Sequence, residues 1–172
     1  MNWFNWLKNE LESRGHEVFV PTFPTTQGQS LENWLKVFEP LKSKVDSDTI
    51  FIGHSLGPAF ILNILERLNV KVRASILVAG FLGLLGHEEF DKLNGPFSDR
   101  EFDFEKIKNN CENFYVINSK DDPYVPLSKG VELAEKLGVD LIKLDNSGHI
   151  NSEFGFDKFE FILKYIDILE QN

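Results

Sequence analysis

The chain has a single cysteine among its 172 residues, and this shortage excludes two kinds of stabilisation. Cys111 cannot form an internal disulfide, and it has no second cysteine with which to build a zinc cluster. One unpaired thiol fits a reducing compartment. Nothing near Cys111 in the sequence suggests activation of the thiol, so we interpret it as a partly buried structural residue.

Positive charge is also scarce, and long apolar runs are missing. Lys and Arg number 18 against 27 Asp and Glu, which gives a formal net charge of −9. This charge opposes binding to nucleic acid or to an anionic membrane. No run approaches the roughly 20 apolar residues of a membrane helix, and residues 1–6 do not resemble a secretory signal. We therefore expect a cytoplasmic protein without nucleic-acid or membrane partners.

The chain does contain enough apolar material for a core, since hydrophobic residues make up 42% of it and 16 are phenylalanines. Apolar periodicity predicts helices and strands that alternate to the end of the chain, without repeats or a linker. The expected helices cover residues 3–14, 31–42, 58–68, 127–137 and 156–169. The expected strands cover residues 16–20, 50–53, 72–79, 114–118 and 139–144.

These elements predict one α/β domain over residues 1–172, with a mostly parallel sheet of about five strands and helices on both faces. The runs at 72–79 and 114–118 are almost continuously apolar, which is typical of parallel strands covered on two sides.

Residues 80–103 form the longest irregular stretch. It contains four apolar residues near its start, namely Phe81, Leu82, Leu84 and Leu85. Loops at the carboxyl ends of parallel strands usually border a ligand site, so this stretch is a candidate cap with an apolar substrate pocket. The alternative, equally open, is that these side chains simply close the core.

The pentapeptide Gly53-His54-Ser55-Leu56-Gly57 lies between an apolar strand and a helix-like run. A serine at the tip of a sharp strand-to-helix turn, flanked by glycines that permit close packing, is a nucleophile elbow. The short motif alone is weakly specific. The strand before it and the helix after it make Ser55 a candidate nucleophile.

A serine hydroxyl needs a base to take its proton and an acid to hold that base. In α/β-hydrolases the chain order is Ser, then Asp or Glu, then His, each on a loop after a strand. Asp121-Asp122 follows the strand at 114–118, and His149 follows the strand at 139–144. Considered alone, the Asp121-Asp122 pair is also consistent with an ordinary turn, and His149 with an ordinary surface residue. Their occurrence together, in this order after Ser55, favours a catalytic triad.

The other three histidines show weaker evidence of a catalytic role. His54 is interpreted as packing beside the elbow, His87 lies in the irregular stretch, and His16 begins an expected strand. No histidine pair has the i, i+4 spacing of a metal site, so we expect no metal.

These motifs resemble the family of small single-domain serine hydrolases related to retinoblastoma-binding protein 9 and the YdeN-like bacterial proteins. The likeness runs nearly end to end, through residues 3–11, the elbow, residues 106–111, the stretch 121–126 and Gly148-His149. The resemblance implies that Asp122, directly before Pro123, is the acid beside Ser55 and His149, with Asp121 shaping the turn. It also implies hydrolysis of small esters or amides without a cofactor.

Two features depart from the family pattern. Cys111 is followed by Glu112 and Asn113, so the L-x-C-x-E motif is absent and no retinoblastoma-type partner is inferred. Members of the family also begin with a strand and a glycine-rich loop upstream of the helix at residue 3. That strand lies centrally, and its loop supplies one amide of the oxyanion hole.

We therefore hypothesise that the chain is an N-terminally shortened version of a longer protein. The Leu56 amide would be the remaining oxyanion donor, and loss of one donor lowers the rate by about a hundredfold to a thousandfold. Two rival functions follow from the same features: a non-catalytic interaction protein on a hydrolase scaffold, and acyl transfer or lyase chemistry on the same triad.

Overall fold

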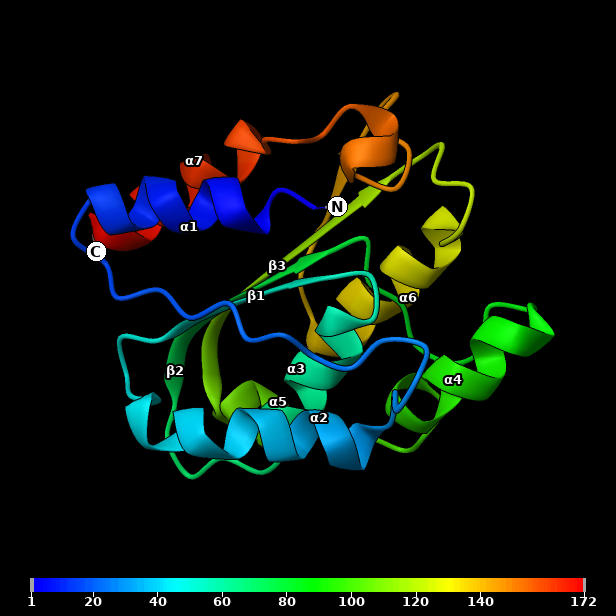
Figure 1. The fold of residues 1–172 in the computed structure, drawn as a ribbon, viewed down its shortest axis with the longest axis horizontal. Coiled ribbons are helices and arrows are strands. Elements are labelled where there is room, and N and C mark those ends of the chain that lie inside the picture. Colours follow the sequence, from blue (N-terminus) through cyan, green and yellow to red (C-terminus); the bar gives the residue numbers. More distant parts are fainter. Residues whose placement is uncertain (1, 172) are drawn as a thin grey trace.

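The computed structural model describes residues 2–171, which surround a four-stranded parallel sheet (Figure 1). The strands are β1 (Ile50–His54), β2 (Val72–Val78), β3 (Cys111–Ser119) and β4 (Leu141–Leu144), and they lie in chain order across the sheet. Every neighbouring pair is parallel, so the loops that follow β1, β3 and β4 meet at one edge of the sheet.

Helices cover both faces of this sheet, which confirms the predicted fold class (Figure 1). One face carries α1 (Phe4–Ser13) and α7 (Leu163–Glu170), which lie side by side and are joined by an ion pair between Arg14 and Asp167 at 2.7 Å. The other face carries α2 (Leu31–Phe38), α3 (Gly57–Leu65), α5 (Phe104–Asn109) and α6 (Leu127–Leu137).

Two apolar clusters, one on each face, hold the layers together. Side chains of α1 and α7 pack on β2 and β3 in the first cluster, which includes Trp3, Leu7, Ile76 and Ile166. In the second cluster α3 is the centre, since all its residues except Gly57 are buried. The helix is enclosed on every side, its polar Asn63 included, and its start at Gly57 and Pro58 lies directly against Gly53 of β1.

Local sequence signals explain where several elements begin and end. The α6 helix follows Pro126 and stops at Gly138, whose φ of 76° is the left-handed conformation that ends many helices. The Ser30 hydroxyl accepts a hydrogen bond from the Asn33 amide at 3.1 Å and begins α2. The helix predicted over 31–42 divides into α2 and the 3₁₀ helix η1 (Glu39–Lys44).

The strand predicted over residues 16–20 is wrong. The alternation of Val18 and Val20 suggested a strand, but no residue of this segment pairs with a strand in the described part of the chain. Phe19 is 46% exposed and Val20 is 39% exposed. A strand requires a hydrogen-bonded neighbour, and the side of β1 away from β2 carries none among the described residues.

The irregular stretch predicted over 80–103 contains a helix, α4 (Glu88–Ser98). Pro96 lies in the last turn of this helix. The helix continues past it because the Asp99 amide donates to the Gly95 carbonyl at 2.8 Å. The last predicted helix begins later than expected, with η2 (Ser152–Phe154) and η3 (Glu160–Ile162) preceding α7.

Membrane-spanning helices and clusters of metal ligands are both absent from residues 2–171. No helix there is long and apolar enough to cross a membrane, and no group of three or more His, Cys, Asp or Glu side chains is placed to hold a metal ion.

Candidate active site

Ser55 occupies the turn between β1 and α3 in a strained backbone conformation. Its φ is 59°, in the left-handed region that residues other than glycine seldom adopt. The Ser55 amide donates to the Val78 carbonyl at 2.9 Å, which ties the turn to β2. The residue is half-buried, and its hydroxyl forms no hydrogen bond within residues 2–171. The geometry is that of the predicted nucleophile elbow.

The two motif glycines differ in what they do. A Cβ on Gly53 would lie 2.7 Å from Ile61 Cδ1 and 2.9 Å from the Pro58 nitrogen, so only glycine fits under the start of α3. A Cβ on Gly57 would meet nothing within 4 Å. Close packing therefore explains Gly53 alone.

Asp122 and His149 are in direct contact on the loops after β3 and β4. His149 Nδ1 lies 2.7 Å from Asp122 Oδ2, and the aspartate side chain is completely buried. The other carboxylate oxygen accepts the Tyr124 and Val125 amides at 2.8 and 3.0 Å. An ionised carboxylate only accepts, so Nδ1 carries the proton and Nε2 is left as the basic nitrogen of the neutral ring.

Asp121 holds the backbone of the loop that carries the histidine. Its carboxylate accepts the Ser119 hydroxyl at 2.6 Å, the Ser147 amide at 3.0 Å and the Gly148 amide at 3.3 Å. These bonds, chiefly the one from the Ser119 hydroxyl, lower the pKa of Asp121 below its ordinary value of 3.8. The two neighbouring aspartates thus fix the ring and the backbone of one loop.

His54 is the link between the elbow and the histidine loop. Its Nε2 lies 2.7 Å from the backbone oxygen of His149, and the two rings are 4.7 Å apart between centroids. The sequence placed His54 beside the elbow but gave no sign of this contact, because the partners are 95 residues apart. The contact brings the loop of His149 next to Ser55.

Tyr124 and Phe154 are further neighbours that the sequence did not indicate. The Tyr124 ring meets His149 edge-on at 5.2 Å, and its hydroxyl donates to the carboxylate of Glu153 at 2.9 Å. Tyr124 is 39% exposed and Phe154 is 36% exposed. Tyr124 and Phe154 thus form an aromatic border beside His149.

The sequence-predicted pocket residues divide between core and surface. Phe81 and Leu82 are buried in the cluster around α3, whereas Leu84 is 47% exposed. Leu85 packs against the same cluster. The predicted oxyanion residue Leu56 precedes α3, where helix geometry leaves the first amides without internal partners.

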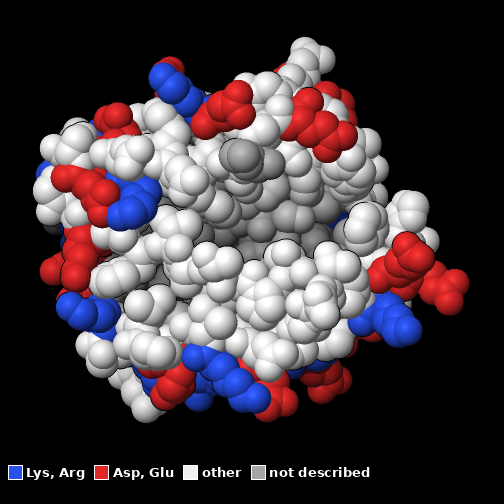
Figure 2. All heavy atoms as spheres, in the orientation of Figure 1, with Lys and Arg blue, Asp and Glu red and all other residues white. Residues whose placement is uncertain are grey.

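Figure 2 shows a hollow near the centre of one face, over the region where Figure 1 places the end of β1. The visible walls of this hollow are almost entirely uncharged, while Lys, Arg, Asp and Glu gather around the periphery. The carboxyl edge of the sheet therefore opens onto a mainly neutral surface.

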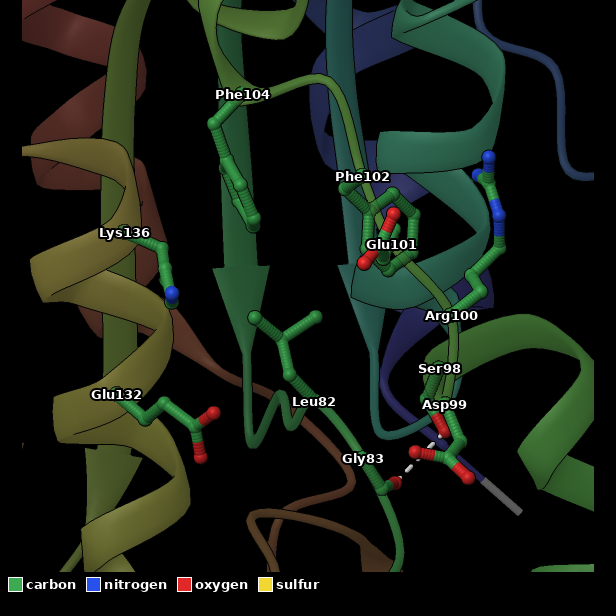
Figure 3. A pocket seen from close by; sticks show the side chains of 10 residues that line it. All are labelled: Leu82, Gly83, Ser98, Asp99, Arg100, Glu101, Phe102, Phe104, Glu132 and Lys136. Carbon is green, nitrogen blue, oxygen red and sulfur yellow. Dashed lines mark hydrogen bonds between the residues drawn. The ribbon is translucent and has the colours of Figure 1, made fainter.

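A second hollow, a groove of about 600 Å³, lies apart from the elbow (Figure 3). Leu82 and Phe104 line it together with Glu132 and Lys136, which reach into it from α6. None of Ser55, Asp122 and His149 contributes to its lining.

Cys111 is confirmed as a buried thiol. It is 2% exposed, and burial raises its pKa to about 11. A thiol that stays protonated and enclosed is a packing residue.

A parallel sheet with a serine at a strained strand-to-helix turn, and an Asp–His pair on the following loops, has the architecture of the α/β-hydrolases. The chain belongs to the serine hydrolase family, whose model matches residues 1–168. The resemblance seen in the sequence is thereby confirmed.

Two curated relatives agree with this assignment. The chain is 30% identical to YdeN of Bacillus subtilis, which is named a hydrolase, over 94% of this chain and 84% of YdeN. It is 33% identical to the serine hydrolase RBBP9 of Rattus norvegicus over 88% of this chain and 80% of the relative. The crystal structure of the Bacillus subtilis ydeN product superposes with a TM-score of 0.91 at 28% identity, covering 99% of this chain and 91% of that one.

Proposed function

We propose that the chain hydrolyses small ester or amide substrates through an acyl-enzyme formed on Ser55. The observation that carries this proposal is the 2.7 Å contact between His149 Nδ1 and the buried carboxylate of Asp122, on a loop adjoining the strained serine. A base oriented by a buried acid next to a nucleophile elbow is the arrangement that serine acylation requires.

The chemistry divides into two displacements. His149 Nε2 takes the Ser55 proton while Oγ attacks the substrate carbonyl carbon, and the resulting imidazolium gives that proton to the leaving alcohol or amine as its bond to carbon breaks. Water then loses a proton to His149 and attacks the acyl group, which releases a carboxylic acid and restores the Ser55 hydroxyl. Asp122 holds the ring and stabilises its charged form.

The Leu56 amide is the proposed oxyanion donor. It lies at the start of α3, where the helix dipole and unpaired amides favour negative charge. Preorganised donors of this kind contribute about 3 to 4 kcal/mol each to acyl transfer.

The charge around the site favours uncharged substrates. The hollow in Figure 2 has few charged groups in its walls, and the Glu153 carboxylate lies beside Tyr124 on the outer side of His149. We propose a neutral acyl group, with the exposed Leu84 and the partly buried Leu85 as the candidate apolar contacts. The cytoplasmic location expected from the single thiol stays part of this proposal.

We further propose that the free edge of β1 can take up one more strand. The Ser55 amide points to β2, so by alternation the amides of Ile52 and His54 face the other way. The strand β1 is half-buried, and its edge away from β2 has no partner strand among residues 2–171. Such a strand would also bring a second oxyanion donor, and without it the scaffold would favour binding over turnover.

The first test is labelling by a fluorophosphonate probe, read by intact mass, on the wild type and on Ser55→Ala and Asp122→Asn. We expect one adduct per wild-type chain, none on Ser55→Ala, and labelling on Asp122→Asn slowed about 10⁴-fold. Hydrolysis of p-nitrophenyl esters of increasing chain length then maps the acyl preference.

An unlabelled but folded wild type would favour the interaction protein as the second candidate. Extending the chain upstream with a relative's first strand and glycine loop then separates the two: labelling gained on extension identifies an incomplete enzyme, and its continued absence refutes the catalytic proposal.

A further inference from the structure

His54 makes a contact that a packing residue would not need. Its Nε2 lies 2.7 Å from the His149 carbonyl oxygen, and a carbonyl only accepts, so Nε2 carries the hydrogen. The ring also lies edge-on to Trp3, at 6.2 Å between centroids. The residue directly before the candidate nucleophile therefore holds the backbone of the candidate base.

The loop that carries His149 needs such external support. Asn146, Gly148 and Ile150 all have positive φ, at 52°, 47° and 51°. This conformation is unfavourable for a β-branched residue such as Ile150 and persists only where the surroundings impose it. The strain therefore lies at Ile150, directly after the histidine, because glycine and asparagine adopt positive φ at little cost.

Two ring N–H groups hold two consecutive carbonyls of this loop. His54 Nε2 donates to the His149 oxygen, and Trp3 Nε1 donates to the Ile150 oxygen at 2.9 Å. The donors come from β1 and from the residue before α1, which are remote from the loop in sequence. Asp121 accepts the Ser147 and Gly148 amides of the same loop. Together, these contacts fix the peptide planes around His149.

The His54 ring is uncharged at neutral pH. Burial, followed by the nearby charge of His149, lowers the pKa of His54 to about 4. The titratable groups that face it are His149 and Asp122, and its other ring neighbour, Trp3, does not titrate. A neutral ring matters here because His149 becomes a cation when it takes a proton, and a second cation 4.7 Å away would oppose that step.

We propose that His54 is a positioning residue for acyl transfer: its neutral Nε2–H fixes the His149 backbone, so that the ring lies between Asp122 and Ser55. The inference rests on the proposed hydrolase function. It assigns a role to the variable residue of the elbow motif. His54 touches neither the substrate nor the reacting atoms and acts through His149.

The test compares a variant that keeps the donor with variants that remove it. In His54→Gln the side-chain amide places an N–H at about the position of Nε2, whereas His54→Phe and His54→Leu have no donor. His87→Gln, at an exposed histidine outside the site, is the matched control. The readouts are the pH dependence of fluorophosphonate labelling and the downfield proton resonance of His149 Nδ1–H, assigned by its loss in His149→Ala.

We expect the control and His54→Gln to label within about threefold of the wild type and to keep the resonance. The donor-less variants should label about tenfold to a hundredfold more slowly, which is typical of a misplaced catalytic group. Their Nδ1–H signal should broaden or vanish through exchange with water, and their pH profile should change shape.

Three outcomes would overturn the proposal. The first is a donor-less variant with the wild-type rate and resonance, and the second is a His54→Gln variant that behaves like His54→Phe. The third is unfolding of both donor-less variants, detected by circular dichroism, which would assign His54 to the stability of the fold. Failure of the hydrolase proposal looks different, since the wild type itself would not label, and the resonance would still test the role of His54.

Discussion

Asp121 and Asp122 are adjacent in sequence, yet one holds the backbone and the other the ring of the same histidine loop. Asp121 accepts the Ser147 and Gly148 amides, and Asp122 accepts from His149 Nδ1. The tandem carboxylates after β3 therefore make two different contacts with one loop, which substitutions can separate.

Asp122→Asn is expected to lower kcat/KM by about 10⁴-fold with little change in fold, because the amide favours the wrong histidine tautomer. Asp121→Asn should lower activity far less and destabilise the protein. Steady-state kinetics on a p-nitrophenyl ester and urea unfolding, run on both variants, check the contrast. Equal effects of the two substitutions on kcat/KM would contradict it.

The stability contributed by Asp121 should depend on pH. The pKa of Asp121 is lowered in the folded state, so its contribution is present above the ordinary value of 3.8 and is lost as pH falls through the lower folded value. The gap in unfolding free energy between the wild type and Asp121→Asn should thus be widest near neutrality and close in acid. A gap that is constant from pH 7 to pH 3 would exclude this account.

Gly53→Ala and Gly57→Ala should behave in opposite ways although they flank the same motif. The new Cβ at Gly53 would lie 2.7 Å from Ile61 and 2.8 Å from the Gly57 backbone, which we expect to destabilise the fold by about 1 to 3 kcal/mol. At Gly57 the space is open and the position is helical, so alanine should be neutral or stabilise by up to about 1 kcal/mol. Thermal unfolding of the two variants and the wild type measures both changes in stability.

His54 predicts an acid-sensitive component of stability. Its pKa is lowered from 6.5 to about 4, so the unfolded chain takes up a proton at pH values where the folded protein does not. The wild type should therefore lose stability as pH falls from 6.5 towards 4, on the order of 2 kcal/mol at pH 5 relative to pH 7. His54→Gln cannot titrate and should lack this loss, which urea unfolding at the two pH values will show.

The sequence was most informative where the residue type itself carries the chemistry. Ser55, the Asp121-Asp122 pair and His149 each follow an apolar run, and the parallel sheet brings their three loops to one edge. The family resemblance then points to Asp122 within the pair. The helix over 127–137 was correct to the residue because Pro126 and Gly138 mark its ends. Such local signals do not depend on the rest of the fold.

Features set by distant partners were missed. The segment at 16–20 has the sequence pattern of a strand but no neighbouring strand to pair with among the described residues. The sequence pattern alone does not show whether such a partner exists. The sequence places His54 beside the elbow but does not predict its hydrogen bond, because the acceptor is 95 residues away. The stretch 80–103 is predicted as irregular, yet it contains α4, whose residue Phe97 is buried in the core.

Gly148 and Phe154 form a steric pair whose coupling can be measured. Gly148 has a φ of 47°, and a Cβ there would run into the Phe154 ring, with Cε1 only 2.7 Å away. Gly148→Ala should therefore destabilise the protein by about 2 to 4 kcal/mol, from backbone strain and from displacement of the ring. Phe154→Ala should be milder, because Phe154 is 36% exposed.

The double variant isolates the steric part of this effect. When the Phe154 ring is absent, the alanine at position 148 no longer clashes with it, and only the backbone strain of about 1 to 2 kcal/mol is left. The double variant should therefore lose less unfolding free energy than the two single variants lose when their losses are added. Urea unfolding of all four proteins gives the coupling energy. Strict additivity would mean that Phe154 moves aside freely, and the destabilisation of Gly148→Ala would then have to come from the altered loop backbone alone.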